Sequence, residues 1–223
     1  MSIGKNEYGV IEYRPSPTMK RKIIMAAAED PDNRIPTTGV AKLIRAALKE
    51  EFPTTKFSVR SKSYTGGSSI RIYWTDGPVD EYATGPLYTD HGVKEVRPIA
   101  RYFAGATFDG RDDSMHYHET PVGMATVRFG ANFVFTRRTL SGEATARAEL
   151  EFRRENKALI EELGTGIHSD NWNTWVLPPV KDTIGYEGSY AMAVSAAGRR
   201  LAFGPGFDRS GFSLTMEESL TVK

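Results

Sequence analysis

Residues 37–74 read TTGVAKLIRAALKEEFPTTKFSVRSKSYTGGSSIRIYW, and this stretch decides the fold that we expect. In its first part, apolar residues from Val40 to Leu48 recur at the spacing of one helix face, and Pro53 ends the helix. Two alternating runs follow, separated by a loop with two adjacent glycines, which can adopt positive φ. The stretch therefore predicts a helix, which Thr37 or Thr38 can cap, followed by a two-stranded hairpin.

The alternation gives this hairpin two unlike faces. The face expected to cover the helix carries Phe57, Val59, Ile70, Ile72 and Trp74. The opposite face carries the residues that we select as candidates for binding nucleic acid or a partner: Lys56, Arg60, Lys62, Arg71 and Tyr73. Cations can contact phosphates and an aromatic ring can stack on a base, so this face resembles a nucleic-acid-binding surface. The alternative is a solvated outer face, where Lys and Arg are common, but no acid faces these cations within the two strands.

Composition limits the class of protein. The chain has 223 residues, of which 39% are hydrophobic and 11% aromatic, so it can form a substantial core. The formal net charge is +1, so any contact with nucleic acid must come from a local patch. Cysteine is absent, which excludes disulfides and the commonest ligands of structural zinc. We find neither a membrane-span pattern nor a signal-peptide pattern and expect a cytoplasmic protein without a membrane partner.

The whole chain predicts an α+β fold, with an antiparallel sheet, a helix–hairpin–helix core (α-β-β-α) and a long helix at residues 142–163. The expected helices are Thr38–Glu51, Val93–Ala104 and Gly142–Leu163, and Ser16-Pro17 predicts the start of another. The expected strands of the sheet are Lys56–Ser63, Ser69–Thr75, Met115–Glu119 and Thr126–Thr136. The expected segments are a strand and helix extension (1–35), the α+β core (36–164) and a β-rich C-terminal segment packed on the same domain (165–223).

Metal-binding signals are weak. His116 and His118 are two residues apart on an expected strand, so their imidazoles could share a face and ligate one metal. A third ligand would come from Asp112, Asp113 or His168. The alternative, which we prefer, is that both histidines lie on the outer face of the strand. The turn at 109–113 could likewise suggest Mg²⁺ binding, but an acidic turn has the same composition. We therefore predict no metal and no cofactor.

Catalytic motifs are absent from the sequence: it contains no GxSxG, no P-loop, no HExxH and no GxGxxG that opens a helix after a strand. We therefore expect a binding protein rather than an enzyme. Trp172 and Trp175 lie in a polar stretch, and they are candidates for partner-binding anchors or for core residues under a long loop.

The run from Val40 to His118 resembles a known family, the large polyvalent protein associated domains of phages and conjugative elements, and the later FGANFVF run extends the likeness to Phe135. The motifs that carry the resemblance are AKLIR at 41–45, FP at 52–53, KFSVR at 56–60, GGSS at 66–69, WTDGP at 74–78 and FDG at 108–110. The resemblance implies a mobile-element protein that acts in a bacterial host cell. It supplies no catalytic residues.

Three hypotheses follow. The leading one is an anti-defence protein, such as a CRISPR or restriction inhibitor, that binds a host defence complex stoichiometrically. The second is a nucleic-acid-binding accessory protein that uses the basic hairpin face. The third is a metal-dependent enzyme built around His116, His118 and Asp113. The oligomeric state is not predicted.

Overall fold

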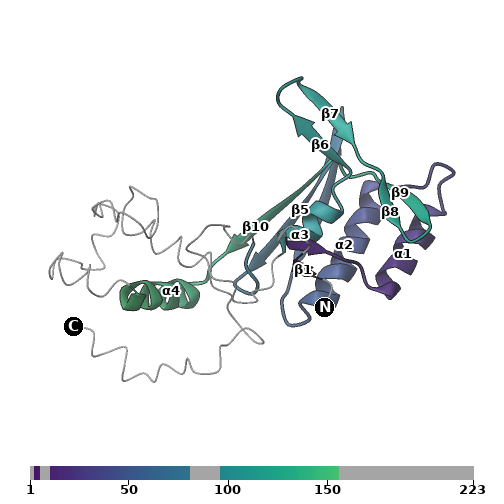
Figure 1. The fold of residues 1–223 in the computed structure, drawn as a ribbon. Helices are drawn as coiled ribbons and strands as arrows, with labels where there is room; N and C mark the ends of the chain where they lie inside the picture. Colours follow the sequence, from purple (N-terminus) through teal and green to yellow (C-terminus); the bar gives the residue numbers. More distant parts are fainter. Residues whose placement is uncertain (1–2, 6–10, 81–95, 156–223) are drawn as a thin grey trace.

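In the computed structural model of the chain, the described residues are 3–5, 11–80 and 96–155, and they form a mixed α+β fold (Figure 1). The helices are α1 (Pro17–Ala27), α2 (Thr37–Glu51), α3 (Arg97–Tyr102) and α4 (Gly142–Glu155). The strands are β1 (Ile3–Lys5), β2 (Ile11–Tyr13), β3 (Arg34–Ile35), β4 (Ser58–Tyr64), β5 (Gly67–Thr75), β6 (Ala106–Asp109), β7 (Ser114–Tyr117), β8 (Thr120–Val122), β9 (Ala125–Phe129) and β10 (Phe133–Thr139). No helix in these ranges is long and apolar enough to cross a membrane.

Helix α2 and the β4–β5 hairpin have the structure that the sequence predicts. The helix buries the predicted apolar face, and Phe52 folds back into the core directly after the helix ends. The predicted threonine cap is wrong, because the residue at the N-cap position is Pro36 and no side chain caps the helix. The Thr37 hydroxyl instead donates a hydrogen bond to the carbonyl oxygen of Gly130 at 2.8 Å. This bond ties the start of α2 to the segment that leads into β10.

The sheet that contains the hairpin is mixed rather than antiparallel, so this part of the prediction is wrong. Its order is β10-β5-β4, with β4 antiparallel to β5 and β10 parallel to β5. After β5 the chain passes through α3 and four further strands, so β10 enters the sheet by a crossover and not by a tight turn. The predicted strand Met115–Glu119 is absent from this sheet, because β7 pairs with β6 in a separate ribbon.

The predicted strand Thr126–Thr136 is in fact two strands in two different sheets. β9 pairs with β3 and β8, whereas β10 pairs with β5. Between them, Gly130 donates its N–H to the carbonyl of Ile35 at 2.8 Å, and its own carbonyl lies 2.7 Å from the Ser68 hydroxyl. A Cβ at Gly130 would lie 2.7 Å from the Ile35 carbonyl oxygen. The close approach of the backbone of residues 35–37 thus requires glycine where the chain changes sheets.

Helix boundaries follow from local chemistry. The N–H of Met19 donates to the Ser16 hydroxyl at 3.1 Å, which confirms the predicted cap of α1. Helix α3 begins at Arg97 with a proline in its first turn, so it starts later than predicted, and residues 93–95 lie outside the described part. The stretch after residue 155 that was predicted to complete α4, and the predicted segment 165–223, also lie outside it.

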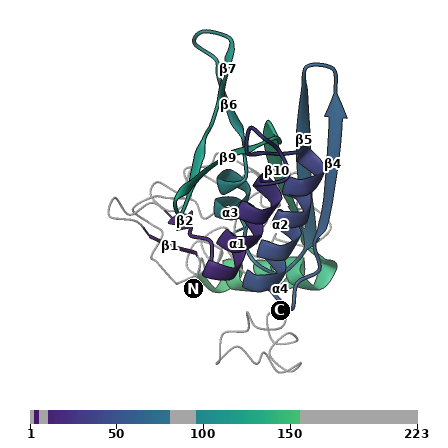
Figure 2. The same cartoon turned by 90° about the vertical axis from the view of Figure 1, so that its right-hand side faces the viewer.

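The core is one cluster of buried side chains between the helices and the inner face of the β10-β5-β4 sheet. Tyr13 from β2 joins it, with its ring centroid 5.4 Å from that of Tyr102 and 6.1 Å from that of Phe103. Burial raises the pKa of Tyr102 to about 12 and raises that of Tyr13 as well. The β4–β5 and β6–β7 hairpins both project past the helices in the same direction (Figure 2).

Candidate functional site

The outer surface of the β10-β5-β4 sheet, on the side opposite α2, is hereafter called the open face. The structure places the predicted hairpin residues there: Lys62 follows Arg60 on β4, and Arg71 precedes Tyr73 on β5. Lys62, Arg60 and Arg71 are exposed, and Tyr73 is half-buried. Arg60 lies directly opposite Arg71 in the strand register. The sequence thus assigned the two faces of the hairpin correctly.

Strand β10 adds three residues to the open face that the sequence analysis missed. In the parallel register Phe135 pairs with Arg71, and Arg137 pairs with Tyr73. Phe133 lies two residues before Phe135, so its side chain points to the same side. The alternation of this run was recognised from the sequence, but nothing in the sequence identifies β5 as its partner strand.

Charge on the open face has one sign. None of its three strands, β4 (Ser58–Tyr64), β5 (Gly67–Thr75) and β10 (Phe133–Thr139), contains an Asp or a Glu. Within the described residues, the ion pairs lie elsewhere, and none of them involves a cation of the open face. Two arginines directly opposite each other on adjacent strands repel and cost stability. A bound anion would convert this repulsion into attraction.

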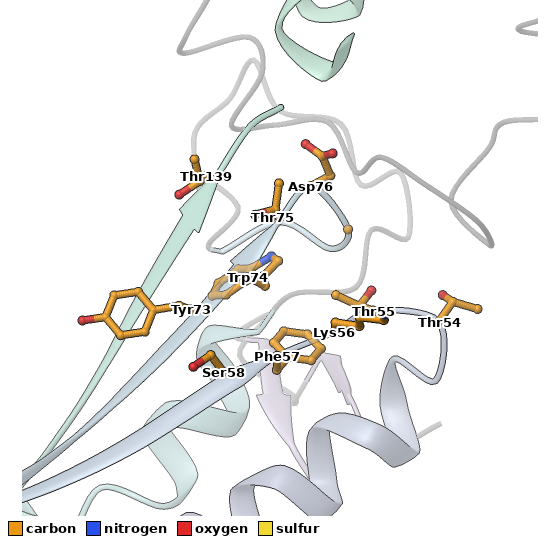
Figure 3. Close-up of a pocket in the computed structure, with 11 residues that line it drawn as sticks. Thr54, Thr55, Lys56, Phe57, Ser58, Tyr73, Trp74, Thr75, Asp76 and Thr139 are labelled. Atoms are coloured by element: carbon orange, nitrogen blue, oxygen red, sulfur yellow. The ribbon is translucent and has the colours of Figure 1, made fainter. Parts of the chain in front are cut away.

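A hollow of about 690 Å³ lies at one end of the open face, where the loop after α2 diverges from the end of β5 (Figure 3). Lys56, Ser58 and Tyr73 line both this hollow and the edge of the open face, so the two are continuous. Phe57 and Trp74 form its apolar part, with ring centroids 5.6 Å apart. The exposed Lys56, which the sequence selected as a binding residue, therefore lies beside the hollow rather than on a strand.

A half-buried arginine holds the turn that forms one wall of the hollow. Arg138 follows Arg137 on β10 and points to the opposite side of the sheet. Its guanidinium donates to the carbonyl oxygens of Asp76 at 2.8 Å and Gly77 at 3.1 Å. The Asp76 carboxylate in turn accepts the N–H of Ser141 at 2.8 Å. The TDGP motif is thus a turn that fixes the end of β10 and the start of α4.

Burial lowers the pKa of Arg138 to about 10, while the nearby carboxylates of Asp76 and Asp80 act in the opposite direction. A pKa of about 10 still leaves the guanidinium charged near neutral pH. The charge therefore strengthens both hydrogen bonds to the turn.

Two of the metal candidates, Asp112 and His116, come together, with the His116 Nε2 3.5 Å from a carboxylate oxygen of Asp112. Among the described residues, the group whose ligand atoms lie within 4.8 Å of one another is Asp109, Asp112 and His116, all on the β6–β7 hairpin. His118 and Asp113 are not part of it, and the His118 ring lies 2.5 Å from the Thr107 hydroxyl. Of the predicted ligands, Asp112 and His116 thus belong to this group, whereas His118 and Asp113 do not.

The cluster at the β6–β7 tip is explained by turn chemistry. The Ser114 hydroxyl donates to the Asp112 carboxylate at 2.7 Å, and the Ser114 N–H donates to the same oxygen at 3.1 Å. These hydrogen bonds, the hydroxyl first, lower the pKa of Asp112. Serine donors therefore stabilise the charged form of this exposed carboxylate.

The other face of the same hairpin is apolar and exposed. Phe108 pairs with Met115 in the register, and Ala106 pairs with Tyr117, so these four side chains share one face. Phe108 is 49% exposed and Tyr117 is 72% exposed. The sequence analysis missed this surface because it expected the histidines on the outer face of the strand, which assigns Met115 and Tyr117 to the inner face. Trp172 and Trp175, the predicted partner-binding residues, and His168 lie outside the described residues.

The fold and the open face define a class: a mixed α+β domain with an exposed sheet surface that combines cations and aromatic rings. Residues 35–141 match the family model described as large polyvalent protein associated domain 29. The match confirms the resemblance seen in the sequence, and it indicates a protein associated with phages and other mobile elements. No curated protein and no solved structure matches the chain. The open face lies entirely within the matched residues.

Proposed function

We propose that this mobile-element-associated protein binds nucleic acid through the open face. The observation that carries the proposal is the like-charged pair Arg60 and Arg71, exposed and directly opposite each other on strands without an acid. Lys62, Arg137 and the adjacent Lys56 extend the same positive charge along and beside the sheet. Such a patch can recruit a polyanion even though the formal net charge of the whole chain is only +1.

Salt dependence measures this interaction directly. If all five cations contact phosphates, the log–log slope of affinity against salt for a single strand is about −3.5, so affinity falls roughly 130-fold between 50 and 200 mM salt. Arg60→Gln with Arg71→Gln leaves three phosphate contacts and a slope of about −2.1, so the affinity falls only roughly 20-fold over the same salt range. Both arginines are exposed, so the fold is expected to survive the change.

The experiment is a fluorescence-polarisation titration of labelled oligonucleotides at several salt concentrations. Lys20→Gln with Lys22→Gln is the matched control, because both lysines are exposed on α1 and the same charge is lost from another surface. The control is expected to keep the wild-type slope. Equal slopes for wild type and the Arg60/Arg71 variant, or no binding by wild type, would overturn the proposal.

A second candidate function keeps the anti-defence role through protein contact. The observation that favours it is the exposed apolar face of the β6–β7 hairpin, where Phe108 and Tyr117 are available to a partner. The test is affinity purification from a bacterial lysate that carries defence systems, with nuclease present throughout. A host defence protein retained by wild type and lost from Phe108→Ser with Tyr117→Ser would support this candidate. Retention by the double variant would exclude this surface.

A further inference from the structure

We infer that the open face selects single-stranded over duplex nucleic acid by stacking unpaired bases on the aromatic side chains of β10. This inference rests on the proposed function and adds the class of ligand. Phe133, Phe135 and Arg137 have no place in the basic hairpin seen in the sequence. They reach the site only because β10 pairs with β5.

The first step of the argument is the exposure of Phe135. Phe135 is 51% exposed on the edge strand β10, next to Arg71 in the register. Phenylalanine has no polar atom that water could stabilise, so this position gains nothing from hydration. An unpaired base can cover the ring and remove its apolar surface from water.

The second step is the geometry of the ring pair. The centroids of Phe133 and Phe135 lie 5.9 Å apart, and their planes differ by 21°, so the two rings are close to parallel. Parallel aromatic faces beside cations form the arrangement on which successive bases of a single strand stack while the backbone follows the positive charge. Tyr73 adds a third ring on the adjacent strand, paired with Arg137.

The third step is the comparison with a duplex. In a double helix the bases are stacked and paired with each other, so the rings of β10 would meet a sugar-phosphate backbone and gain no stacking partner. The cations would still contact duplex phosphates. Charge alone therefore predicts that the single strand and the duplex both bind. The aromatic rings predict that the single strand binds more tightly.

The experiment compares a labelled dT20 strand with a 20-base-pair duplex at 50 mM salt, by fluorescence polarisation. Wild type is expected to bind dT20 more tightly than the duplex. Phe135→Ala is expected to weaken dT20 binding between five-fold and more than a hundred-fold, the range for losing one stacked base, with little change for the duplex. Its salt slope should stay at the wild-type value, because no charge has been removed.

Two further variants control for the fold. Phe135→Tyr keeps the ring and should keep the affinity for dT20. Phe108→Ala removes a similarly exposed ring, 49% against 51%, from the β6–β7 hairpin and should leave binding of dT20 unchanged.

The same titration with a U20 strand identifies RNA as the preferred ligand if U20 binds more tightly than dT20.

Equal affinity for dT20 and the duplex, or unchanged dT20 binding by Phe135→Ala, overturns this inference. If the steep salt slope persists in that case, the proposed function stands without it. If wild type binds none of the oligonucleotides, the proposed function fails as well.

Discussion

Alanine substitution of the adjacent residues Arg137 and Arg138 is expected to change two different properties: nucleic-acid binding for Arg137 and stability for Arg138. Arg138 is directed inward and hydrogen-bonded to the Asp76–Gly77 turn, whereas Arg137 is exposed on the open face. Arg138→Ala should therefore destabilise the fold. Arg137→Ala should leave stability unchanged and weaken only the binding of nucleic acid.

The magnitude follows from the hydrogen bonds that the Arg138 guanidinium donates to this turn. Its loss leaves the carbonyl oxygens of Asp76 and Gly77 without this donor, and each unsatisfied buried group costs about 1–3 kcal/mol. Gly77 is buried but Asp76 is only half-buried, so water can replace one of the two bonds. We expect a loss of about 2–4 kcal/mol, which corresponds to a decrease in Tm of roughly 4–16 °C for a chain of this length. Arg137→Ala should stay within about 0.5 kcal/mol of wild type.

The assay is urea denaturation followed by circular dichroism, with the unfolding slope checked for constancy between variants. Arg138→Lys serves as a second variant: it retains a charge but lacks the planar set of donors, so it should recover only part of the lost stability. A loss below about 1 kcal/mol for Arg138→Ala, or equal losses for the two alanine variants, would refute the role assigned to the turn.

Two further predictions concern single positions. Gly105→Ala should prevent stable folding or lower the Tm by more than 10 °C in a thermal melt. The added Cβ would lie 1.7 Å from the carbonyl oxygen of Phe129, a backbone atom that cannot move aside. A Tm near the wild-type value would contradict the close approach of these backbones. Ser16→Ala should cost about 1 kcal/mol in urea denaturation, because it removes the acceptor of the Met19 N–H at the start of α1, whereas Ser16→Asp, which restores an acceptor, should return most of this stability.

Part of the candidate site could be predicted from the sequence. Strict alternation in a hairpin places Arg60 and Lys62 on one side and Val59 on the other, whatever the rest of the fold does. The structure agrees, with Val59 5% exposed and both cations exposed. The short loop between the strands fixes the register, so the cross-strand pair of Arg60 with Arg71 is also a local property.

The spacing of His116 and His118 shows the limit of reasoning from strand periodicity. Two histidines separated by one residue share a face only inside a regular strand, and β7 ends at Tyr117, before His118. His118 lies in the connection to β8, with its ring 2.5 Å from the hydroxyl of Thr107, the register partner of His116. The orientation of the His118 ring is therefore not set by the alternation of the strand.

The sequence by itself determined helix α2, the β4–β5 hairpin and the sign of the charge on its outer face, because each depends on periodicity and turn chemistry within about 40 neighbouring residues. Only the tertiary structure decided that β10 lies parallel to β5, and so placed Phe133, Phe135 and Arg137 beside the hairpin cations. The change of sheet at Gly130 made this possible. Gly130 is hydrogen-bonded there to Ser68, which lies 62 positions away in the chain, and to Ile35, which lies 95 positions away. Pairing over such separations depends on the packing of the whole core, which a local pattern does not encode.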